Sequence, residues 1–361
     1  MMFNEFKKKE SPFLSLLGVG GGIGSNLTRG ASGPTFSASA LGQAMPQETG
    51  GNQSNANPRI AQTADGSVIL ASGNRNSVYR TTNNGQSWTQ TYDGTEASYT
   101  YGHGSIFIND AGTHAIASPR GSNFGKIIYS SNGGQSWSTK VTTSDSVYMG
   151  TYDQTTGIVM FGDRGAGGGA SSDLNRSSNH GQSWSVVIDS NQSDHYAVGM
   201  KKGSAGEAVS WSTGKYYTSS NGGSSWTQQT TPTGHDYTST AYVVYNSSGR
   251  YFYKGSSAKE ILYADSGTGA RTSTTISGAS GTIRVVQIDS DDVLYVAFSS
   301  GEIWYSTDNG VSYNEIEEWK TYWDTTDQYE PQDINTNNSS GRFLVGTRGS
   351  GGNEIHVLQK S

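Results

Sequence analysis

Hydrophobic positions along this chain come in short runs, and polar phrases rich in Ser, Asn and Gly separate the runs. Residues 77–80, 126–129 and 302–305 are alternating or β-branched runs that precede such phrases, and residues 184–188 follow one. Runs of about four to eight residues with a period of two are typical of β-strands, and the polar phrases between them are typical of tight turns. The pattern therefore predicts many short strands joined by hairpin turns, with almost no helix.

One of these polar phrases recurs at a nearly constant spacing. Its copies end at residues 88, 137, 184, 226 and 313, which gives steps of 49, 47, 42 and 87 residues. The last step corresponds to two periods of about 43 residues, so a degenerate copy is expected near residues 263–274. Repetition with this period and four short strands per unit is the signature of β-propeller blades. The five copies are TTNNGQSW (81–88), SSNGGQSW (130–137), SSNHGQSW (177–184), SSNGGSSW (219–226) and STDNGVSY (306–313).

The repeated phrase has the residues that a rigid hairpin turn needs. Ser or Thr at its first position and Asn or Asp at its third can hydrogen-bond to neighbouring backbone, and Gly at its fifth can adopt a positive φ. The closing aromatic residue begins the next strand, where a large ring can bury its surface between neighbouring sheets. We therefore expect a structural role for Asn83, Gly85, Trp88, Asn132, Gly134, Trp137, Asn179, Gly181, Trp184, Asn221, Gly223, Trp226, Asp308, Gly310 and Tyr313.

Counting four-strand units from Arg59 predicts a ring of seven blades. Residues 35–41 are expected to supply a strand that the seventh blade lacks, because a closed ring leaves no unpaired sheet edge. A six-bladed ring with an irregular C-terminal segment is the competing count. The all-β propeller domain is expected to span residues 33–361. Six units are predicted to end near residues 93, 142, 189, 231, 277 and 318, and the seventh has strands at 332–335, 342–346 and 354–359.

Residues 1–32 fall outside the predicted ring. They contain a charged start, an apolar stretch and a Gly-rich tether, which together cannot form a core of their own. We expect this N-terminal arm to dock onto another chain or onto the propeller, and a disordered tail is the alternative. A cleaved secretory signal is a further alternative, although Glu10, Ser11 and Pro12 interrupt the join between its charged and apolar parts. The expected docking residues are Phe13, Leu14, Leu16 and Leu17.

Composition and charge exclude several classes of partner. The chain has 361 residues, a formal net charge of -6 and only 15% charged residues, so it lacks the basic face that nucleic acid or an anionic lipid surface requires. The absence of Cys excludes disulfides and thiolate metal sites. No apolar run approaches the roughly 18 residues needed to cross a bilayer. We therefore expect no nucleic-acid partner and no insertion into a membrane.

No metal or cofactor is predicted from the sequence. The six His residues lack the short pairing of a zinc site. Four of the five repeated phrases have Asn at the third position, which favours turn bonding over calcium coordination. Gly-rich residues 18–24 depart from the spacing of a dinucleotide-binding loop, and a flexible tether is the better interpretation. We therefore expect no metal and no cofactor.

A cluster of aromatic and acidic residues follows the last repeated phrase, over residues 313–330. Such clusters serve sugar stacking or protein contacts. In the alternative interpretation, the two Trp residues pack under a long connection between two blades. The candidate ligand surface comprises Trp319, Tyr322, Trp323 and Tyr329.

The phrase S/T-x-D/N-x-G-x-x-W resembles the Asp-box, or BNR repeat, and the chain is similar to Asp-box propeller proteins over residues 59–318. That family includes sialidases, other glycoside hydrolases, sortilin-type receptors and seven-bladed photosystem assembly factors, so the resemblance implies a fold and leaves the activity open. The N-terminal stretch KKKESPFLSLLGVGGGIGS separately resembles the opening of virion structural proteins from marine tailed bacteriophages. This second resemblance implies a structural role in a virion.

The resemblance to sialidases implies a site with an arginine cluster, a Tyr nucleophile activated by a Glu, and an acidic proton donor. The family's Arg-Ile-Pro motif matches Arg59 and the Ile that follows it, but Ala replaces the Pro. Arg250, Arg284 and Arg342 lie in or beside predicted strands, and they either face the central channel or lie on the surface. Because the set is incomplete, we expect no catalytic residues and a protein that is not an enzyme.

Together these features favour a non-catalytic virion structural protein, a component of a tail or fibre that is present in multiple copies. Its arm would dock onto other virion proteins, and its propeller would recognise a host-surface glycan, a receptor or another protein. A sialidase-like glycoside hydrolase that acts on host glycans is one alternative. A cellular assembly factor or adhesin, secreted or held at a cell surface, is the other.

Overall fold

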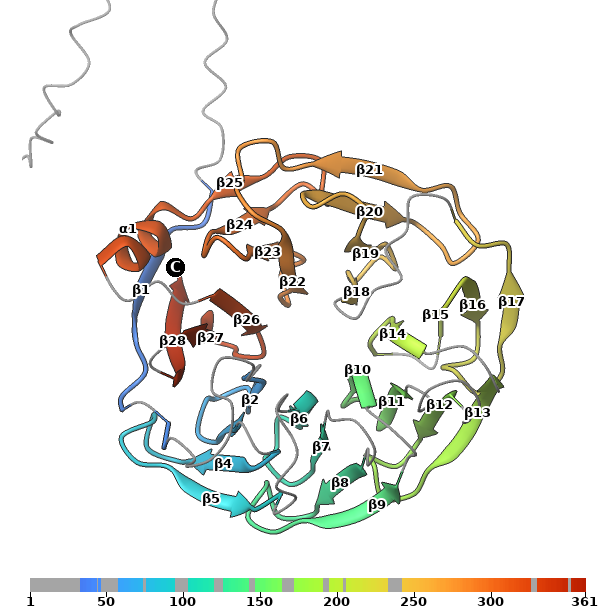
Figure 1. Cartoon of the computed structure of the whole chain (residues 1–361), viewed down its shortest axis with the longest axis horizontal. Helices are drawn as coiled ribbons and strands as arrows, with labels where there is room; N and C mark the ends of the chain where they lie inside the picture. Colours follow the sequence, from blue (N-terminus) through green and yellow to red (C-terminus); the bar gives the residue numbers. More distant parts are fainter. Residues whose placement is uncertain are drawn as a thin grey trace, which may run out of the picture. The chain divides into compact units, whose positions relative to one another are not determined.

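In the computed structural model, seven four-stranded antiparallel sheets surround a central channel (Figure 1). The structure describes residues 33–43, 45–46, 58–73, 76–94, 103–119, 126–142, 147–163, 172–190, 195–203, 206–232, 242–325, 330–349 and 352–361. The predicted seven-bladed β-propeller is confirmed, and the six-bladed alternative is wrong. The residues of the predicted arm, 1–32, lie outside the described part of the chain. Among the described residues, no helix combines the length and the apolar character that crossing a membrane requires.

Each blade is a meander whose first strand lies nearest the channel. Blade 1 comprises β2 (Ile60–Gln62), β3 (Ile69–Ser72), β4 (Val78–Thr81) and β5 (Thr89–Tyr92), and blade 2 comprises β6 (His103–Ile108), β7 (Ala115–Pro119), β8 (Lys126–Ser130) and β9 (Ser138–Thr142). Blade 3 comprises β10 (Val147–Asp153), β11 (Ile158–Asp163), β12 (Ser172–Ser177) and β13 (Ser185–Ser190), and blade 4 comprises β14 (His195–Met200), β15 (Ala208–Ser212), β16 (Lys215–Ser219) and β17 (Thr227–Gln229). Blade 5 comprises β18 (Val243–Tyr245), β19 (Tyr251–Lys254), β20 (Glu260–Ala264) and β21 (Thr272–Thr275), and blade 6 comprises β22 (Ile283–Ile288), β23 (Leu294–Phe298), β24 (Ile303–Ser306) and β25 (Asn314–Glu315). Blade 7 comprises β26 (Glu330–Asn335), β27 (Arg342–Gly349), β28 (Gly352–Lys360) and β1 (Phe36–Ala40).

Blade 7 closes the ring with strands from both ends of the propeller. Its outermost strand, β1, pairs antiparallel with β28, so that Phe36 lies opposite Lys360 and Ala40 lies opposite His356. The strand predicted at residues 35–41 therefore occupies the expected place. This pairing joins segments more than 300 residues apart and leaves β28 without a free edge, which removes a site of edge-to-edge aggregation.

The hydrophobic core is divided into clusters that lie between neighbouring blades. Blades 1 and 2 share a cluster that includes Leu70 and Ile106, and blades 3 and 4 share one that includes Met160 and Val198. Every residue of the second strands β3, β11, β15, β19 and β23 is buried, because both faces of a middle strand pack against a neighbouring sheet. Burial on both faces explains why these strands are continuous apolar runs rather than strictly alternating ones.

The repeated phrase forms the turn between the third and fourth strands of a blade. In blade 1, the Thr81 hydroxyl donates to Asn83 Oδ1 at 2.8 Å and accepts from the Gly85 N–H at 3.1 Å. Asn83 Oδ1 also accepts from the Ser87 N–H at 3.0 Å. The same three contacts recur in the other four copies. Because the side chains satisfy the turn's own backbone, the turn is rigid without help from outside.

The Gly and the Trp of each phrase fit the turn against the preceding blade. Gly134 has a φ of +80°, and a Cβ added there would lie 2.7 Å from Leu70 Cδ2 of blade 1. Trp137 packs on the cluster that blades 1 and 2 share, and its Nε1 donates to Thr91 Oγ1 of blade 1 at 3.1 Å. The Gly is therefore required twice, for its φ and for the close approach of the neighbouring blade.

Blade 5 contains the degenerate copy of the turn, where the sequence predicted it. Opposite residues Tyr263 and Thr272 flank the turn just as Arg80 and Thr89 flank the phrase in blade 1. At the place of the Trp stands Arg271, whose guanidinium lies 5.2 Å from the centre of the Tyr216 ring of blade 4. A cation on an aromatic ring thus replaces the aromatic ring between these two blades.

The connection between blades 6 and 7 contains helix α1 (Glu317–Thr325), which the sequence pattern did not predict. The helix lies beside β1 at the outside of blade 7 (Figure 1). Trp319 is fully buried and its Nε1 donates to the Gly301 carbonyl at 2.8 Å, while Trp323 is 6% exposed. These two Trp residues therefore anchor the helix to the propeller.

Candidate functional site in the central channel

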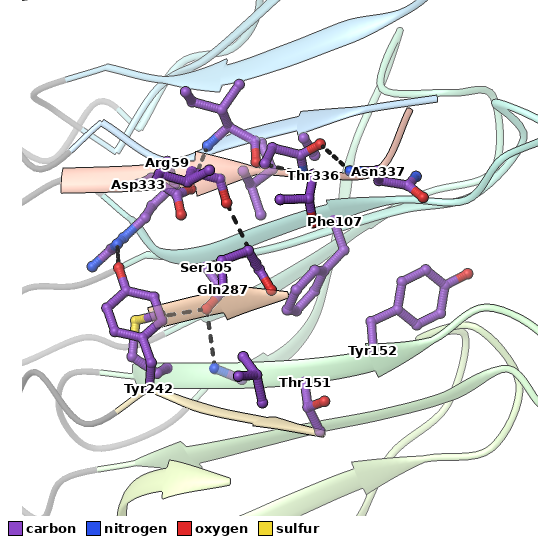
Figure 2. Close-up of a pocket in the computed structure, with 18 of the residues that line it drawn as sticks. Arg59, Ser105, Phe107, Thr151, Tyr152, Tyr242, Gln287, Asp333, Thr336 and Asn337 are labelled. Atoms are coloured by element: carbon purple, nitrogen blue, oxygen red, sulfur yellow. Dashed lines mark hydrogen bonds between the residues drawn. The ribbon is translucent and has the colours of Figure 1, made fainter. Parts of the chain in front are cut away.

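The central channel is lined by residues from the innermost strand of every blade. Its cavity has a volume of about 170 Å³. Because alternate residues of a strand point to opposite faces, each inner strand sends only a few side chains towards the axis. Figure 2 shows Arg59 and Tyr242 at one end of this cavity and Tyr152 and Asn337 at the other.

The first end of the channel is crossed by a bridge between three blades. Arg59, just before β2, donates through Nη1 to the Tyr242 hydroxyl and to the Gln332 carbonyl, the latter at 2.6 Å. The Tyr242 hydroxyl also donates to the Gln332 carbonyl at 3.0 Å, and its ring lies 5.6 Å from the Arg59 guanidinium carbon. All three residues are buried. The bridge therefore ties blades 1, 5 and 7 together and narrows this end.

A carboxylate beside the bridge balances its charge. Asp333 Oδ2 accepts from the Ile60 N–H at 2.9 Å. Burial lowers the pKa of Arg59, but Coulombic interactions with Tyr242 and Asp333, together with the hydrogen bond to Tyr242, outweigh this effect and leave the pKa raised. Burial raises the pKa of Asp333 above its usual value, and the attraction to Arg59 opposes the rise. The guanidinium is thus held charged and committed to protein partners.

Two further arginines share one carboxylate between blades 6 and 7. Arg284 on β22 pairs with Glu330 Oε1, and Arg348 on β27 pairs with Glu330 Oε2 at 2.5 Å. Glu330 is the more enclosed partner, with its side chain 15% exposed. Each arginine therefore has an internal counter-charge, as Arg59 does.

The second end of the channel is open to solvent. Gln154 Nε2 donates to Asp110 Oδ2 at 2.6 Å, and Asn337 Nδ2 donates to Asp110 Oδ1 at 3.0 Å, which links blades 2, 3 and 7 across this rim. Lys202 of blade 4 completes the rim, and both Lys202 and Asp110 are exposed. Within the described part of the chain, neither a hydrogen bond nor an ion pair engages the Lys202 ammonium group.

The wall between the two ends combines aromatic and hydroxyl groups. The rings of Phe107 and Tyr152 lie 5.8 Å apart, from blades 2 and 3 respectively. Thr151 is 9% exposed and lines the cavity, and none of the hydrogen bonds among described residues uses its hydroxyl. In Figure 2 these three side chains lie on the open side of the Arg59–Tyr242 bridge. The channel therefore offers ring faces together with unused polar groups.

Of the arginines expected at the channel, Arg59 lines it and Arg284 lies on an innermost strand. Arg250 instead pairs with Asp265 at 2.6 Å and donates to the Asn309 carbonyl at 3.2 Å, so it lies at the junction of blades 5 and 6. Arg342 belongs to β27, the second strand of its blade. The placement of Arg250 and Arg342 at the channel is therefore corrected. The sequence pattern missed Tyr242, since only ring closure brings blade 5 to Arg59.

The expected ligand surface on residues 313–330 is also corrected. Trp319 and Trp323 are buried, so the alternative arrangement, with both residues packed under the connection between two blades, describes them. The Tyr322 hydroxyl lies 2.9 Å from His356 Nδ1 and is engaged in the same packing. Tyr329, like the expected docking residues Phe13, Leu14, Leu16 and Leu17, lies outside the described residues. Among the described residues, no three His, Asp or Glu side chains are grouped so that they could hold a metal ion.

The geometry defines a seven-bladed β-propeller with an axial cavity that is open at one end, and comparison with known proteins agrees on the fold. No family model and no curated protein matches the sequence. A structure of YCF48 bound to D1 peptide is similar with a TM-score of 0.61 and 13% identity, over 89% of this chain and 94% of that chain. YCF48 from Cyanidioschyzon merolae has a TM-score of 0.62 and 12% identity, over 90% and 99% of the two chains. A catalytically inactive virginiamycin B lyase from Staphylococcus aureus with quinupristin has a TM-score of 0.62 and 13% identity, over 90% and 99%. At these identities the likeness shows the propeller fold alone.

Proposed function

We propose that this chain is a non-catalytic structural protein of a bacteriophage virion, of the Asp-box class of propellers. Residues 1–32 would dock it to a neighbouring virion protein, and the propeller would recognise a host surface or another protein. The observation that carries the non-catalytic part is the pairing of Arg59, Arg284 and Arg348 with groups of the protein itself. Arginines that bind or activate a substrate need donors that face the ligand.

The position of β1 supports a docking role for the arm. Because β1 is the outermost strand of blade 7, the chain enters the propeller at its rim (Figure 1). An arm that ends there would tether the ring from its side, and the axial cavity would stay available for recognition. The virion assignment itself rests on the resemblance of the N-terminal stretch.

Mass spectrometry of purified particles tests this proposal. The chain is expected among the structural proteins in multiple copies, and its absence from the particles would refute the virion role. A full-length variant with Phe13→Asp and Leu17→Asp is expected to be lost from the particles while the propeller stays folded. A matched variant with Ser15→Asp, in the same stretch, is expected to be retained.

The contact between Arg59 and the Tyr242 hydroxyl favours a glycoside hydrolase as the second candidate, because an arginine and a tyrosine meet at one end of the channel. Incubation with fluorogenic sialosides and a panel of host polysaccharides tests it. A hydrolase must release product, and the release must fall in Tyr242→Phe, which removes only the hydroxyl. Equal release by both proteins, or none by either, removes this candidate.

A docking platform for a peptide is the third candidate, since the similar propeller YCF48 is known with a bound D1 peptide. On this proposal the chain is a cellular assembly factor or an adhesin, secreted or at a cell surface. The genes beside its own distinguish the candidates. Capsid and tail genes there would favour the virion role, and genes of a cellular assembly pathway would favour the platform.

A further inference from the structure

We propose that the open end of the central channel binds one neutral pyranose unit, such as the terminal sugar of a glycan. This inference deepens the recognition role proposed above and rests on it. The channel supplies the three things that a sugar ring requires: a space of the right size, a ring face for stacking, and polar groups that are not already used.

The space is a cup on the axis of the propeller. The buried bridge of Arg59, Tyr242 and Gln332 forms its floor, and the rim at Asp110 and Lys202 is exposed. The cavity volume of about 170 Å³ accommodates a single six-membered sugar ring and excludes a folded peptide segment. A ligand therefore enters with one residue and leaves the rest of its chain in solvent.

The wall of the cup carries an aromatic pair. Phe107 is half-buried, and its ring is 5.8 Å from those of Tyr152 and Phe161, so packing from behind holds it in place. A rigid ring that faces an aqueous cavity stacks against the C–H face of a pyranose at little entropic cost. Met149 and Ile288 add apolar surface to the same cup.

The polar groups divide into used and unused ones. Both polar atoms of the Gln287 side chain are engaged, with the Ile334 carbonyl at 3.3 Å and the Ile288 N–H at 3.0 Å, so this amide holds the wall together. In contrast, the Thr151 hydroxyl and the Lys202 ammonium group have no partner among the described residues. A hydroxyl acceptor and donor beside a cationic donor matches the vicinal hydroxyl groups of a sugar.

The charges at the rim select a neutral sugar over an acidic one. The carboxylates of Asp110 and Asp153 both act electrostatically on Lys202 and offset its charge. At the floor, Arg59 is committed to Tyr242 and Gln332. A carboxylated sugar would therefore meet Asp110 without a free arginine to pair with, which is unfavourable.

Titration of the full chain with methyl glycosides of glucose, galactose, mannose and N-acetylglucosamine tests the inference, with N-acetylneuraminic acid as the acidic comparison. Ligand-observed NMR is expected to detect at least one neutral glycoside with a dissociation constant of about 1 mM. Chemical-shift changes of the Met149 and Met200 methyl groups, which line the cup, locate the binding in the unmodified protein.

Two variants and one control make the test specific. Thr151→Val keeps the side-chain shape and is expected to weaken binding about fivefold, and Phe107→Leu is expected to weaken it at least about threefold. Thr89→Val makes the same chemical change as Thr151→Val on an exposed outer strand and is expected to leave binding unchanged. Folding of each variant is checked by its amide NMR spectrum.

The inference is overturned if no neutral glycoside binds, if only N-acetylneuraminic acid binds, or if binding leaves the two methyl groups unshifted. Equal binding by the unmodified protein and Thr151→Val also overturns it. Particle proteomics tests the virion role separately. A chain that binds a sugar but is absent from particles keeps this inference and loses the virion role, and a virion protein without sugar binding does the reverse.

Discussion

The guanidinium group of Arg271 lies 5.2 Å from the centre of the Tyr216 ring, across the contact between blades 5 and 4. It is also 5.5 Å from the Tyr251 ring and donates to the Gly267 carbonyl at 3.0 Å. In blades 1 to 4 the equivalent turn ends in Trp. The degenerate repeat has therefore kept the contact between blades while changing its chemistry.

Replacing Arg271 with Ala is expected to lower the free energy of unfolding by about 2 kcal/mol, because a partly buried cation–π contact and a hydrogen bond are lost together. Urea unfolding followed by tryptophan fluorescence measures this loss. Lys140→Ala is the matched control, since Lys140 lies 5.3 Å from the Tyr129 ring but is exposed. The control is expected to lose under about 1 kcal/mol, and equal losses would show that the Arg271 contact has no special weight.

The number of blades was predictable from the sequence because each turn is built from local hydrogen bonds. Thr81, Asn83 and Gly85 complete one turn within five residues, so the phrase is visible without knowledge of the rest of the chain. The closing strand was predictable for a different reason. Three strands at the C-terminal end lacked a fourth, and an open edge is unfavourable.

The channel was not predictable, because its contacts depend on the closed ring. Arg59 meets Tyr242 over 183 positions of sequence, and no local pattern marks the two residues as partners. The two Trp residues of α1 were ambiguous for the same reason. Sequence shows that Trp319 is aromatic but does not show that the Gly301 carbonyl lies 2.8 Å from its Nε1.

Gly134→Ala is expected to destabilise the protein by about 3 kcal/mol. Two costs add, since Ala disfavours a φ of +80° and its Cβ would lie 2.7 Å from Leu70 Cδ2. Gly203→Ala separates them, because Gly203 has a φ of +83° but nothing within 4 Å of the added Cβ. That variant is expected to lose about 1 kcal/mol in chemical denaturation. A loss at Gly134 no greater than at Gly203 would contradict the proposed role of close contact between blades.

The stacked pair of His114 and His180 should show coupled titration. Their ring centres lie 4.7 Å apart, and each ring has its Nδ1 2.8 Å from a Tyr hydroxyl, of Tyr129 and Tyr152 respectively. Burial lowers the pKa of His114, and the charge of His180 lowers it further. His180→Asn, which suits the positive φ at that position, is therefore expected to raise the pKa of His114 in an NMR titration. An unchanged or lower value would show that the two rings are not electrostatically coupled.

His356 should make the propeller less stable in acid. It is 2% exposed, with Nε2 3.0 Å from Thr347 Oγ1, and burial lowers its pKa from 6.5 to about 4 even though Glu354 Oε2 lies 3.7 Å away. The unfolded chain therefore binds a proton between these two pH values and the folded chain does not, so stability falls as the pH drops through this window. The loss from this group is about 3 kcal/mol. Urea unfolding at several pH values is expected to show a shallower decline in His356→Gln, which cannot titrate, and an equally steep decline would assign the acid sensitivity to other groups.

Glu330→Gln tests whether one carboxylate keeps two arginines from binding external anions. Arg284 and Arg348 are 35% and 27% exposed, so both can reach solvent once Glu330 no longer neutralises them. The variant is expected to lose about 1 to 2 kcal/mol of stability and to bind sulfate about tenfold more tightly than the unmodified protein, because two guanidinium groups are left without a counter-charge. NMR of the arginine Nε–H groups during a sulfate titration measures this gain. Glu315→Gln is the matched control, since Glu315 pairs with a single exposed lysine, Lys320, at 2.9 Å, and no gain is expected there. If both variants bind sulfate as weakly as the unmodified protein, internal pairing is not what keeps this end of the propeller from acting on anionic ligands.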